Sequence, residues 1–147
     1  METTLIILKP DAVQRGLIGR IISRFENKGL KIVAAKMMTI DRGLAERHYA
    51  VHKGKPFYDR LIQFITSAPV LALAIRGNGA IDVCRKLMGA TCSSKAEPGT
   101  IRGDFGIAES FNLVHGSDAP DTAAAELDLF FNADQICDYD RAIETWV

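Results

Sequence analysis

The segment Asn112-Leu113-Val114-His115-Gly116-Ser117-Asp118 carries the clearest chemical signal in the chain. It brings one histidine to the end of a short apolar run, and a helix is expected to begin near Pro120. A strand that leads into a helix holds a side chain rigidly at the sheet edge, close to the N–H donors of the helix. This arrangement suits a nucleophilic imidazole that meets a phosphate group. A single histidine is more often structural, so the rest of the chain must supply its partners.

Composition restricts the classes of function. The chain has 147 residues, 48% of them hydrophobic, which predicts one globular domain spanning residues 1–147. Its 18 basic and 18 acidic side chains give a formal net charge of zero. Proteins that coat nucleic acids are usually strongly basic, so no nucleic-acid partner is required. Any anion site must therefore be a local group of arginine and lysine side chains.

The N-terminus and the cysteines indicate a cytoplasmic protein without a membrane partner. Met1-Glu2-Thr3-Thr4 contains no basic residue, and the apolar run Leu5–Leu8 is too short for a signal peptide or a membrane span. Three widely spaced cysteines without a CxxC motif fit reduced thiols and predict neither a disulfide framework nor a zinc site.

Four segments read as strands. Leu5–Leu8 and Val70–Ile75 are apolar throughout, as expected of central strands with both faces covered. Leu30–Ile40 mixes polar and apolar residues, which favours an edge strand, and residues 112–115 supply the fourth.

Helices are expected between these strands. Helical spacing of apolar residues appears at 17–25, 41–49, 61–65 and 81–88, and a further helix follows Pro120. Residues 89–110 show no sustained periodicity, and a loop of this length is usually functional. The order is βαββαβ with extra helices between the second and third strands. It predicts an α+β sandwich of the ferredoxin-like type, with a four-stranded antiparallel sheet and helices on its faces.

Four motifs together resemble the nucleoside diphosphate kinase family. The segment at His115 is similar to the family signature N-x-x-H-G-S-D, and Lys9-Pro10-Asp11 to its K-P-D. His48-Tyr49 followed by Lys55-Pro56-Phe57 resembles a third motif of the family, and residues 99–105 resemble a fourth. The resemblance runs in register from about Thr4 to Trp146. One departure is Cys92-Ser93, where the family commonly has Asn-Pro or Asp-Pro.

The resemblance implies a phosphotransferase that moves the γ-phosphoryl group of a nucleoside triphosphate such as ATP to a nucleoside diphosphate. The transfer is implied to be ping-pong, through a phosphohistidine on His115, and to accept any base. It depends on Mg²⁺, which the nucleotide phosphates would hold, since no cluster of protein metal ligands is evident. The P-loop motif is absent.

The resemblance also assigns roles around the imidazole. Glu126 would hold the second ring nitrogen of His115, with Ser117 as a bridge, as carboxylates orient histidines elsewhere. Lys9 would reach the transferred phosphate and the ribose 3′-hydroxyl. Tyr49 would place its hydroxyl near the γ-phosphate.

Other residues are implied to bind the rest of the nucleotide. Arg85, Arg102 and the Thr91 hydroxyl would hold the α- and β-phosphates, a task for which guanidinium groups are well suited. Phe57 would stack on the base, with Leu61 near the ring edge. Stacking accepts every base, because each one offers a π-face.

Three further assignments concern histidines and a ribose contact. Asn112 is implied to bond the ribose hydroxyls, whereas His48 and His52 are expected at the surface.

The family assembles as hexamers or tetramers, and a homohexamer is expected here, with contacts from the loop at Pro98 and the tail at Trp146.

Two other classes of function compete with the kinase. An RNA-binding module of the same fold needs neighbouring aromatic residues on its central strands, and Leu5–Leu8 and Val70–Ile75 contain none. A catalytically idle assembly protein would have no need of both His115 and Glu126. Both alternatives are weaker than the enzyme.

Overall fold

The computed structural model describes residues 1–147 and contains one antiparallel sheet of four strands. The strands are β1 (Glu2–Leu8), β2 (Lys31–Met38), β3 (Val70–Gly77) and β4 (Val114–Gly116). They lie in the order β2-β3-β1-β4, so the two wholly apolar runs form the central strands, as the sequence predicts. With its flanking helices the sheet forms the expected α+β, ferredoxin-like fold.

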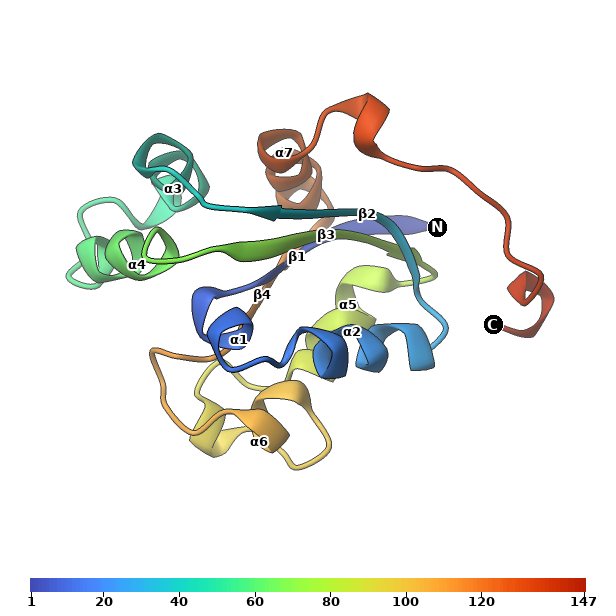
Figure 1. Cartoon of the computed structure of the whole chain (residues 1–147), viewed down its shortest axis with the longest axis horizontal. Coiled ribbons are helices and arrows are strands. Elements are labelled where there is room, and N and C mark those ends of the chain that lie inside the picture. The colour runs from blue at the N-terminus through green and yellow to red at the C-terminus, as the bar shows by residue number, and fades with distance from the viewer.

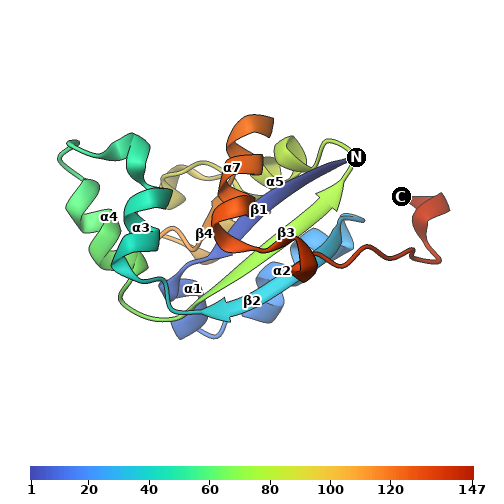
Figure 2. The ribbon, with the colours of Figure 1, turned by 90° about the horizontal axis from the view of Figure 1, so that it is seen from above.

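Seven α-helices cover both faces of the sheet (Figure 1). They are α1 (Pro10–Gln14), α2 (Ile18–Asn27), α3 (Arg42–His48), α4 (Tyr58–Ile65), α5 (Ala80–Met88), α6 (Ile101–Phe105) and α7 (Pro120–Phe130). Helices α3, α4 and α7 lie over one face, as Figure 2 shows, and the other four lie beneath.

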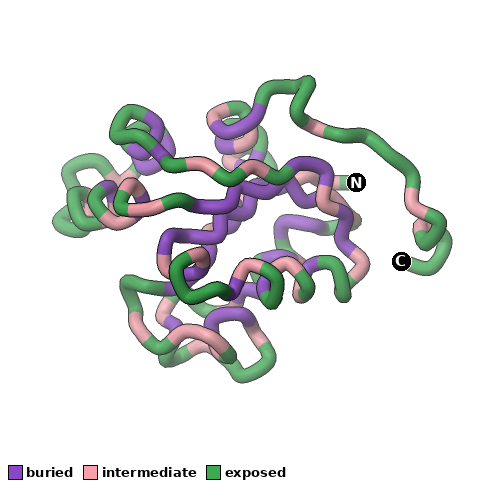
Figure 3. Tube along the Cα trace, viewed as in Figure 1, coloured by how far each residue is buried: buried purple, intermediate pink, exposed green.

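Strand β1 contributes to two separate hydrophobic cores because its side chains alternate between the faces. Ile6 and Leu8 belong to the core beneath helices α1, α2, α5 and α6. Leu5 and Ile7 belong to the core beneath α3, α4 and α7. All four side chains are fully buried, and the central strands β1 and β3 contain the longest buried runs of the sheet (Figure 3).

The local structure differs from the sequence prediction in three places. Helix α1 begins directly after β1, where Pro10 occupies a favourable first-turn position. The segment 89–110, expected to be a loop, contains α6 and a 3-10 turn at Ser93–Lys95. The fourth strand begins at Val114 and not at Asn112.

The C-terminal tail crosses the edge formed by β2. Cys137 donates its backbone N–H to the Val33 carbonyl at 2.7 Å, and Arg141 donates to the carbonyls of Gly29 and Leu30 at 2.9 and 3.1 Å. Trp146, expected to be a contact residue, is 84% exposed at the end of this tail. None of the helices combines the length and the apolar character needed to cross a membrane.

Candidate active site

The edge strand β4 fixes His115 against the centre of the sheet. His115 pairs with Ile7 of β1, and the following Gly116 pairs with Ile6. A Cβ atom at Gly116 would lie 2.6 Å from the Met88 sulfur of α5, so no larger residue fits there unless the Met88 side chain moves. Glycine next to the histidine therefore allows β4 to approach α5 closely.

Glu126 on α7 orients the imidazole. Its Oε2 atom lies 3.0 Å from Nε2 of His115 and accepts a 2.6 Å hydrogen bond from Ser117. Because a carboxylate can only accept, Nε2 of His115 carries the proton and the lone pair of the neutral ring is on Nδ1. Burial raises the pKa of Glu126, but the hydrogen bonds from His115 and Ser117 outweigh this effect and hold the pKa below its ordinary value.

Lys9 is a buried cation without a carboxylate partner. It follows β1 directly, is 8% exposed, and donates from Nζ to Oδ1 of Asn112 at 2.8 Å. Burial and the charge of Arg102 lower its pKa to about 8. No carboxylate forms an ion pair with it. An unpaired buried charge is costly, and a bound anion would remove that cost.

Arg102 on α6 is a second buried cation. Its three guanidinium nitrogens donate to the carbonyls of Asn112, Gly89 and Val114 at 3.1, 2.9 and 2.7 Å. Burial and the charge of Arg85 lower its pKa to about 10. It has no carboxylate partner, so it supplies positive charge while it holds the loop together.

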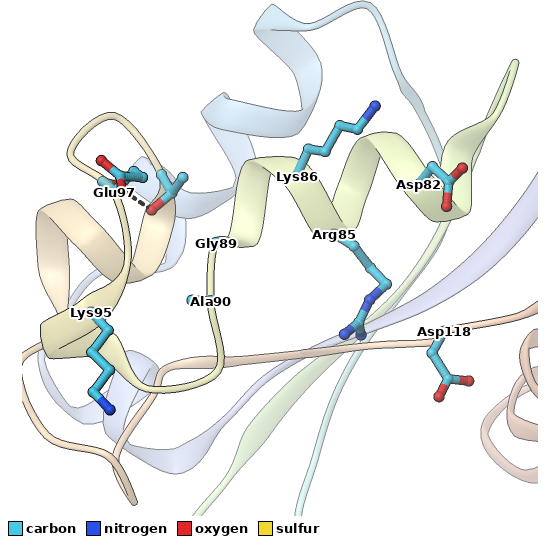
Figure 4. A pocket seen from close by; sticks show the side chains of 9 residues that line it. Asp82, Arg85, Lys86, Gly89, Ala90, Lys95, Glu97 and Asp118 are labelled. Carbon is cyan, nitrogen blue, oxygen red and sulfur yellow. Dashed lines mark hydrogen bonds between the residues drawn. The ribbon is translucent and has the colours of Figure 1, made fainter.

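Arg85 on α5 completes the group of cations. Its Nη1 donates to the Gly116 carbonyl at 3.2 Å. Arg85 and Asp118 line both the cavity at His115 and a neighbouring cavity of about 570 Å³, drawn in Figure 4, whose other charged side chains come from α5 and the loop after it. Of the three cations, Arg85 is therefore the one that also lines this second, polar cavity.

Most of the predicted site residues share one cavity of about 260 Å³. Eight of the eleven line it: Lys9, Tyr49, Arg85, Thr91, Arg102, Asn112, His115 and Glu126. The sequence separations are large, since Lys9 and Asn112 lie 103 residues apart. The fold thus brings together polar side chains that the sequence keeps separate.

The remaining three lie outside this cavity. Ser117 is buried behind Glu126 and reaches the imidazole only through that carboxylate. Phe57 is 36% exposed and lies 5.4 Å, ring centre to ring centre, from His52, which lines the cavity. Leu61 packs against the core beneath α3, α4 and α7. Phe57 is thus at the rim of the cavity, whereas Leu61 is mainly a packing residue.

His48 was expected at the surface, and that prediction is wrong. It lines the cavity at 8% exposure, with its ring centre 4.6 Å from that of His115. Burial and the charge of His115 lower its pKa to about 3, so the ring is neutral, and neither nitrogen has a hydrogen-bond partner. Leu44, Ala45 and His48 share the buried face of α3 at helical spacing, and this spacing could have revealed its position.

Two observations define what the cavity can bind. Burial raises the pKa of Tyr49 to about 12, so its hydroxyl remains a hydrogen-bond donor at neutral pH. Ligand atoms of His48, His115 and Glu126 lie within 4.8 Å of one another, the one such group in the chain. Glu126 is already bonded to two neighbours, and the buried cation Lys9 faces the same cavity. These surroundings favour an anion over a metal ion.

Comparison with known proteins agrees with this anion site. The family model described as nucleoside diphosphate kinase matches residues 2–136. A nucleoside diphosphate kinase of Thermomicrobium roseum is 53% identical over 147 residues, which cover 100% of this chain and 99% of that protein.

Two solved structures have the same fold. The nucleoside diphosphate kinase of Halobacterium salinarum in complex with CDP is 51% identical and superposes with a TM-score of 0.96, covering 99% of this chain and 97% of its own. The Borrelia burgdorferi enzyme with bound vanadate and ADP, described as a transition-state mimic, is 40% identical with a TM-score of 0.91, covering 97% and 94%. The chain therefore belongs to the nucleoside diphosphate kinase family.

Proposed function

We propose that the protein transfers the γ-phosphoryl group in two steps, by way of a phosphohistidine on Nδ1 of His115. Its family makes it a nucleotide phosphotransferase, and the proposal concerns the route and the residues. The observation that carries it is the fixed imidazole: Nε2 is bonded to Glu126, while Nδ1 has no hydrogen-bond partner and lies beside cations that lack carboxylates. In the first step Nδ1 attacks the γ-phosphorus and the nucleoside diphosphate leaves. In the second step a different diphosphate attacks and Nδ1 leaves.

The cations would stabilise the charge of the transferring group. Catalysis of phosphoryl transfer consists mainly of positioning and electrostatic stabilisation. Lys9 lies closest in this scheme to the transferred group and the ribose 3′-hydroxyl, and Tyr49 would donate its hydroxyl to the γ-phosphate. Arg85, Arg102 and Thr91 would hold the α- and β-phosphates.

The outer part of the cavity would hold the nucleoside. Asn112 would contact the ribose, since its side chain is fixed by Lys9 and by a 3.0 Å bond to the Thr91 carbonyl. The exposed ring of Phe57 would stack on the base without reading its edge, which supports broad base specificity. Leu61 would contribute at most to the packing of that ring.

Mg²⁺ would enter with the nucleotide. The cavity offers two carboxylates, and Glu126 is occupied by His115 and Ser117. Asp118 is exposed and is the one carboxylate free to meet a hydrated ion. This donor set fits a metal held mainly by phosphate oxygens and water. When bound, Mg²⁺ would neutralise phosphate charge.

A label-transfer experiment tests the two-step route. The protein is mixed with γ-labelled ATP and Mg²⁺, and the nucleotide is then removed. We expect an acid-labile, alkali-stable label on the protein that added GDP or dTDP discharges with similar efficiency. A folded protein that binds ATP but takes up no label would contradict the phosphohistidine route. Discharge by only one of the two diphosphates would contradict broad base specificity.

Glu126→Ala should slow phosphorylation of His115 without preventing it. The carboxylate orients the ring and fixes its tautomer, and loss of orientation costs roughly 10- to 100-fold in rate. Single-turnover labelling with saturating ATP measures this rate. Ser117→Ala is the matched comparison, because it removes only one of the two bonds to the carboxylate and should have a smaller effect. A wild-type rate in Glu126→Ala would remove its proposed role.

We also propose a cytoplasmic homohexamer. All three cysteines are unpaired, which is consistent with a reducing compartment. Ile107 and Trp146 are each 84% exposed and Phe111 is 54% exposed, so several large apolar side chains lack cover in a single chain. Light scattering at micromolar concentration is expected to give six times the chain mass of 16.1 kDa. A mass of four chains would favour the tetramer, and a monomer would contradict both assemblies.

A further inference from the structure

The three residues before His115 form a strained turn. Leu113 has a φ of +72° and is the one non-glycine residue of the chain with a positive φ. The N–H of Val114 donates to the carbonyl of Asn112 at 2.8 Å, an i to i+2 bond. Together these features define the γ-turn with positive φ, which is rare and strained. Glycine at position 113 would adopt this φ without strain, but it would lose the packing of the Leu113 side chain, which is fully buried.

Hydrogen bonds hold this turn on every side. The backbone N–H of Leu113 donates to Oδ2 of Asp11 at 3.1 Å, and its carbonyl accepts from the backbone N–H of Lys9 at 2.8 Å. Arg102 donates to the carbonyls on either side, those of Asn112 and Val114. A strained backbone persists only where its surroundings determine it in this way.

Asp11 has no part in the chemistry proposed above. It forms no ion pair and does not line the cavity at His115. Burial raises its pKa, against the opposing effect of the N–H bond from Leu113. The charge of Lys9 acts on Asp11 and lowers its pKa, but no ion pair forms between the two, so the position of this partly buried carboxylate requires a further explanation. Its one long-range hydrogen bond, over 102 residues, goes to the strained turn.

We infer that Asp11 is a positioning residue: its carboxylate holds the turn at Leu113 and thereby sets Asn112 and His115 relative to Lys9. The inference rests on the role proposed for His115.

The geometry explains why this position matters. Asn112 lies one residue before Leu113 and His115 two residues after it, so a change in φ at Leu113 redirects one of these side chains relative to the other. Lys9 is coupled to the same turn twice, through its backbone N–H to Leu113 and through Nζ to Asn112. The relative positions of Lys9, Asn112 and His115 therefore all depend on the conformation of this one turn. Asp11 lies two residues after Lys9, and its carboxylate is the one side-chain group that accepts the N–H of Leu113.

Two substitutions and a control test the inference. Asp11→Ala removes the acceptor, whereas Asp11→Asn keeps an acceptor oxygen and removes only the charge. Glu2→Ala is the control, because Glu2 lies at the opposite end of β1 and its carboxylate likewise accepts a backbone N–H, from Ile81 at 3.2 Å. Each variant is measured at saturating ATP for the single-turnover rate of His115 labelling, together with KM, the thermal midpoint and amide exchange at Leu113.

A positioning role predicts a pattern that a structural role does not. In Asp11→Ala we expect the saturating labelling rate to fall by at least about tenfold, with a smaller change in KM, and the Leu113 amide to exchange faster. Asp11→Asn should recover most of that rate. Glu2→Ala should lower the thermal midpoint and leave the labelling rate unchanged.

Other outcomes would overturn the inference. A wild-type labelling rate in folded Asp11→Ala would leave Asp11 with a structural role only, and so would a labelling rate in Glu2→Ala as slow as that in Asp11→Ala. Should Asp11→Ala fail to fold, Asp11→Leu decides, because leucine fills the volume without offering an acceptor. A wild-type labelling rate in folded Asp11→Leu would then overturn the inference. Failure of the wild-type protein to take up any label would instead contradict the proposed function, while amide exchange at Leu113 would still report whether Asp11 holds the turn.

Discussion

The His115→Ala variant is expected to fold, to bind ATP and to transfer no phosphoryl group. The substitution removes the only imidazole that combines a partnered Nε2 with a free Nδ1. Loss of a covalent nucleophile costs several powers of ten, so kcat should fall by at least about 10⁴-fold. The phosphate-binding cations are untouched, and the dissociation constant of ATP should change little.

Calorimetry with ATP and circular dichroism verify that the His115→Ala protein binds and is folded, and coupled turnover of ATP with GDP measures the loss. His115→Gln is the second variant, because its amide can still donate to Glu126 but has no nucleophilic nitrogen. Appreciable turnover in either variant would exclude His115 as the nucleophile. Loss of ATP binding along with turnover would assign it to binding and not to the chemistry.

Lys9→Met is expected to lower activity and raise stability at the same time. The methionine fills a similar volume without the charge, and loss of one preorganised donor to a transferring group costs roughly 10²- to 10³-fold in kcat. The free enzyme, in contrast, is relieved of a buried cation. A pKa near 8 in place of 10.5 corresponds to roughly 3 kcal/mol, from which the lost bond to Asn112 subtracts about 1 kcal/mol. A net gain of about 2 kcal/mol should remain.

The lowered pKa of Lys9 also predicts how the free energy of unfolding depends on pH. Below pH 8 Lys9 is protonated in both states and the folded protein carries the full penalty. Between about pH 8 and 10.5 the unfolded chain binds more protons at this site, so the contribution of Lys9 to the free energy of unfolding rises with pH. The difference in stability between Lys9→Met and wild type should therefore shrink across this range, as urea titrations at several pH values would measure.

Lys31→Met provides the matched control. Lys31 is 5% exposed, as buried as Lys9, but it pairs with Glu144 at 3.1 Å and donates to the Tyr139 carbonyl at 2.6 Å. Removing a paired cation leaves its partners unsatisfied, so Lys31→Met should be less stable than wild type. If both lysine variants lost stability equally, the cost assigned to the unpaired charge of Lys9 would be wrong.

The sequence predicts the sheet well, because its signal is local. Leu5–Leu8 and Val70–Ile75 are apolar on both faces, and only central strands bury both faces. Helix α6 was not predicted because its five residues, which include Gly103, are too few to show a period. Helix α1 is equally short and reads as the end of a strand followed by a turn. Short helices are determined by their tertiary contacts more than by their own pattern.

For the site, residue types and motifs predict the participants but not the contacts. The motifs predict that Lys9, Arg102 and His115 act at one site, and in the structure all three line one cavity. The spacing of apolar residues on α3 indicates that His48 is buried, but its ring contacts with His115 and Phe130 depend on how α3 docks against β4 and α7, which no local pattern states. The turn at Leu113 is equally hidden, since leucine gives no sign of a positive φ and the Asp11 carboxylate that binds its N–H is 102 residues away.

The wide sequence separation of these contacts has a consequence for the order of folding. Lys9 meets Asn112 across 103 residues, and Asp11 meets Leu113 across 102. Contacts of such range are entropically expensive to close and depend on the rest of the topology. A ribosome-bound chain that has not yet released β4 can build both central strands but no nucleophile site. Recovery of phosphotransfer during refolding therefore reports the docking of the last strand, whereas circular dichroism reports the earlier helices and sheet.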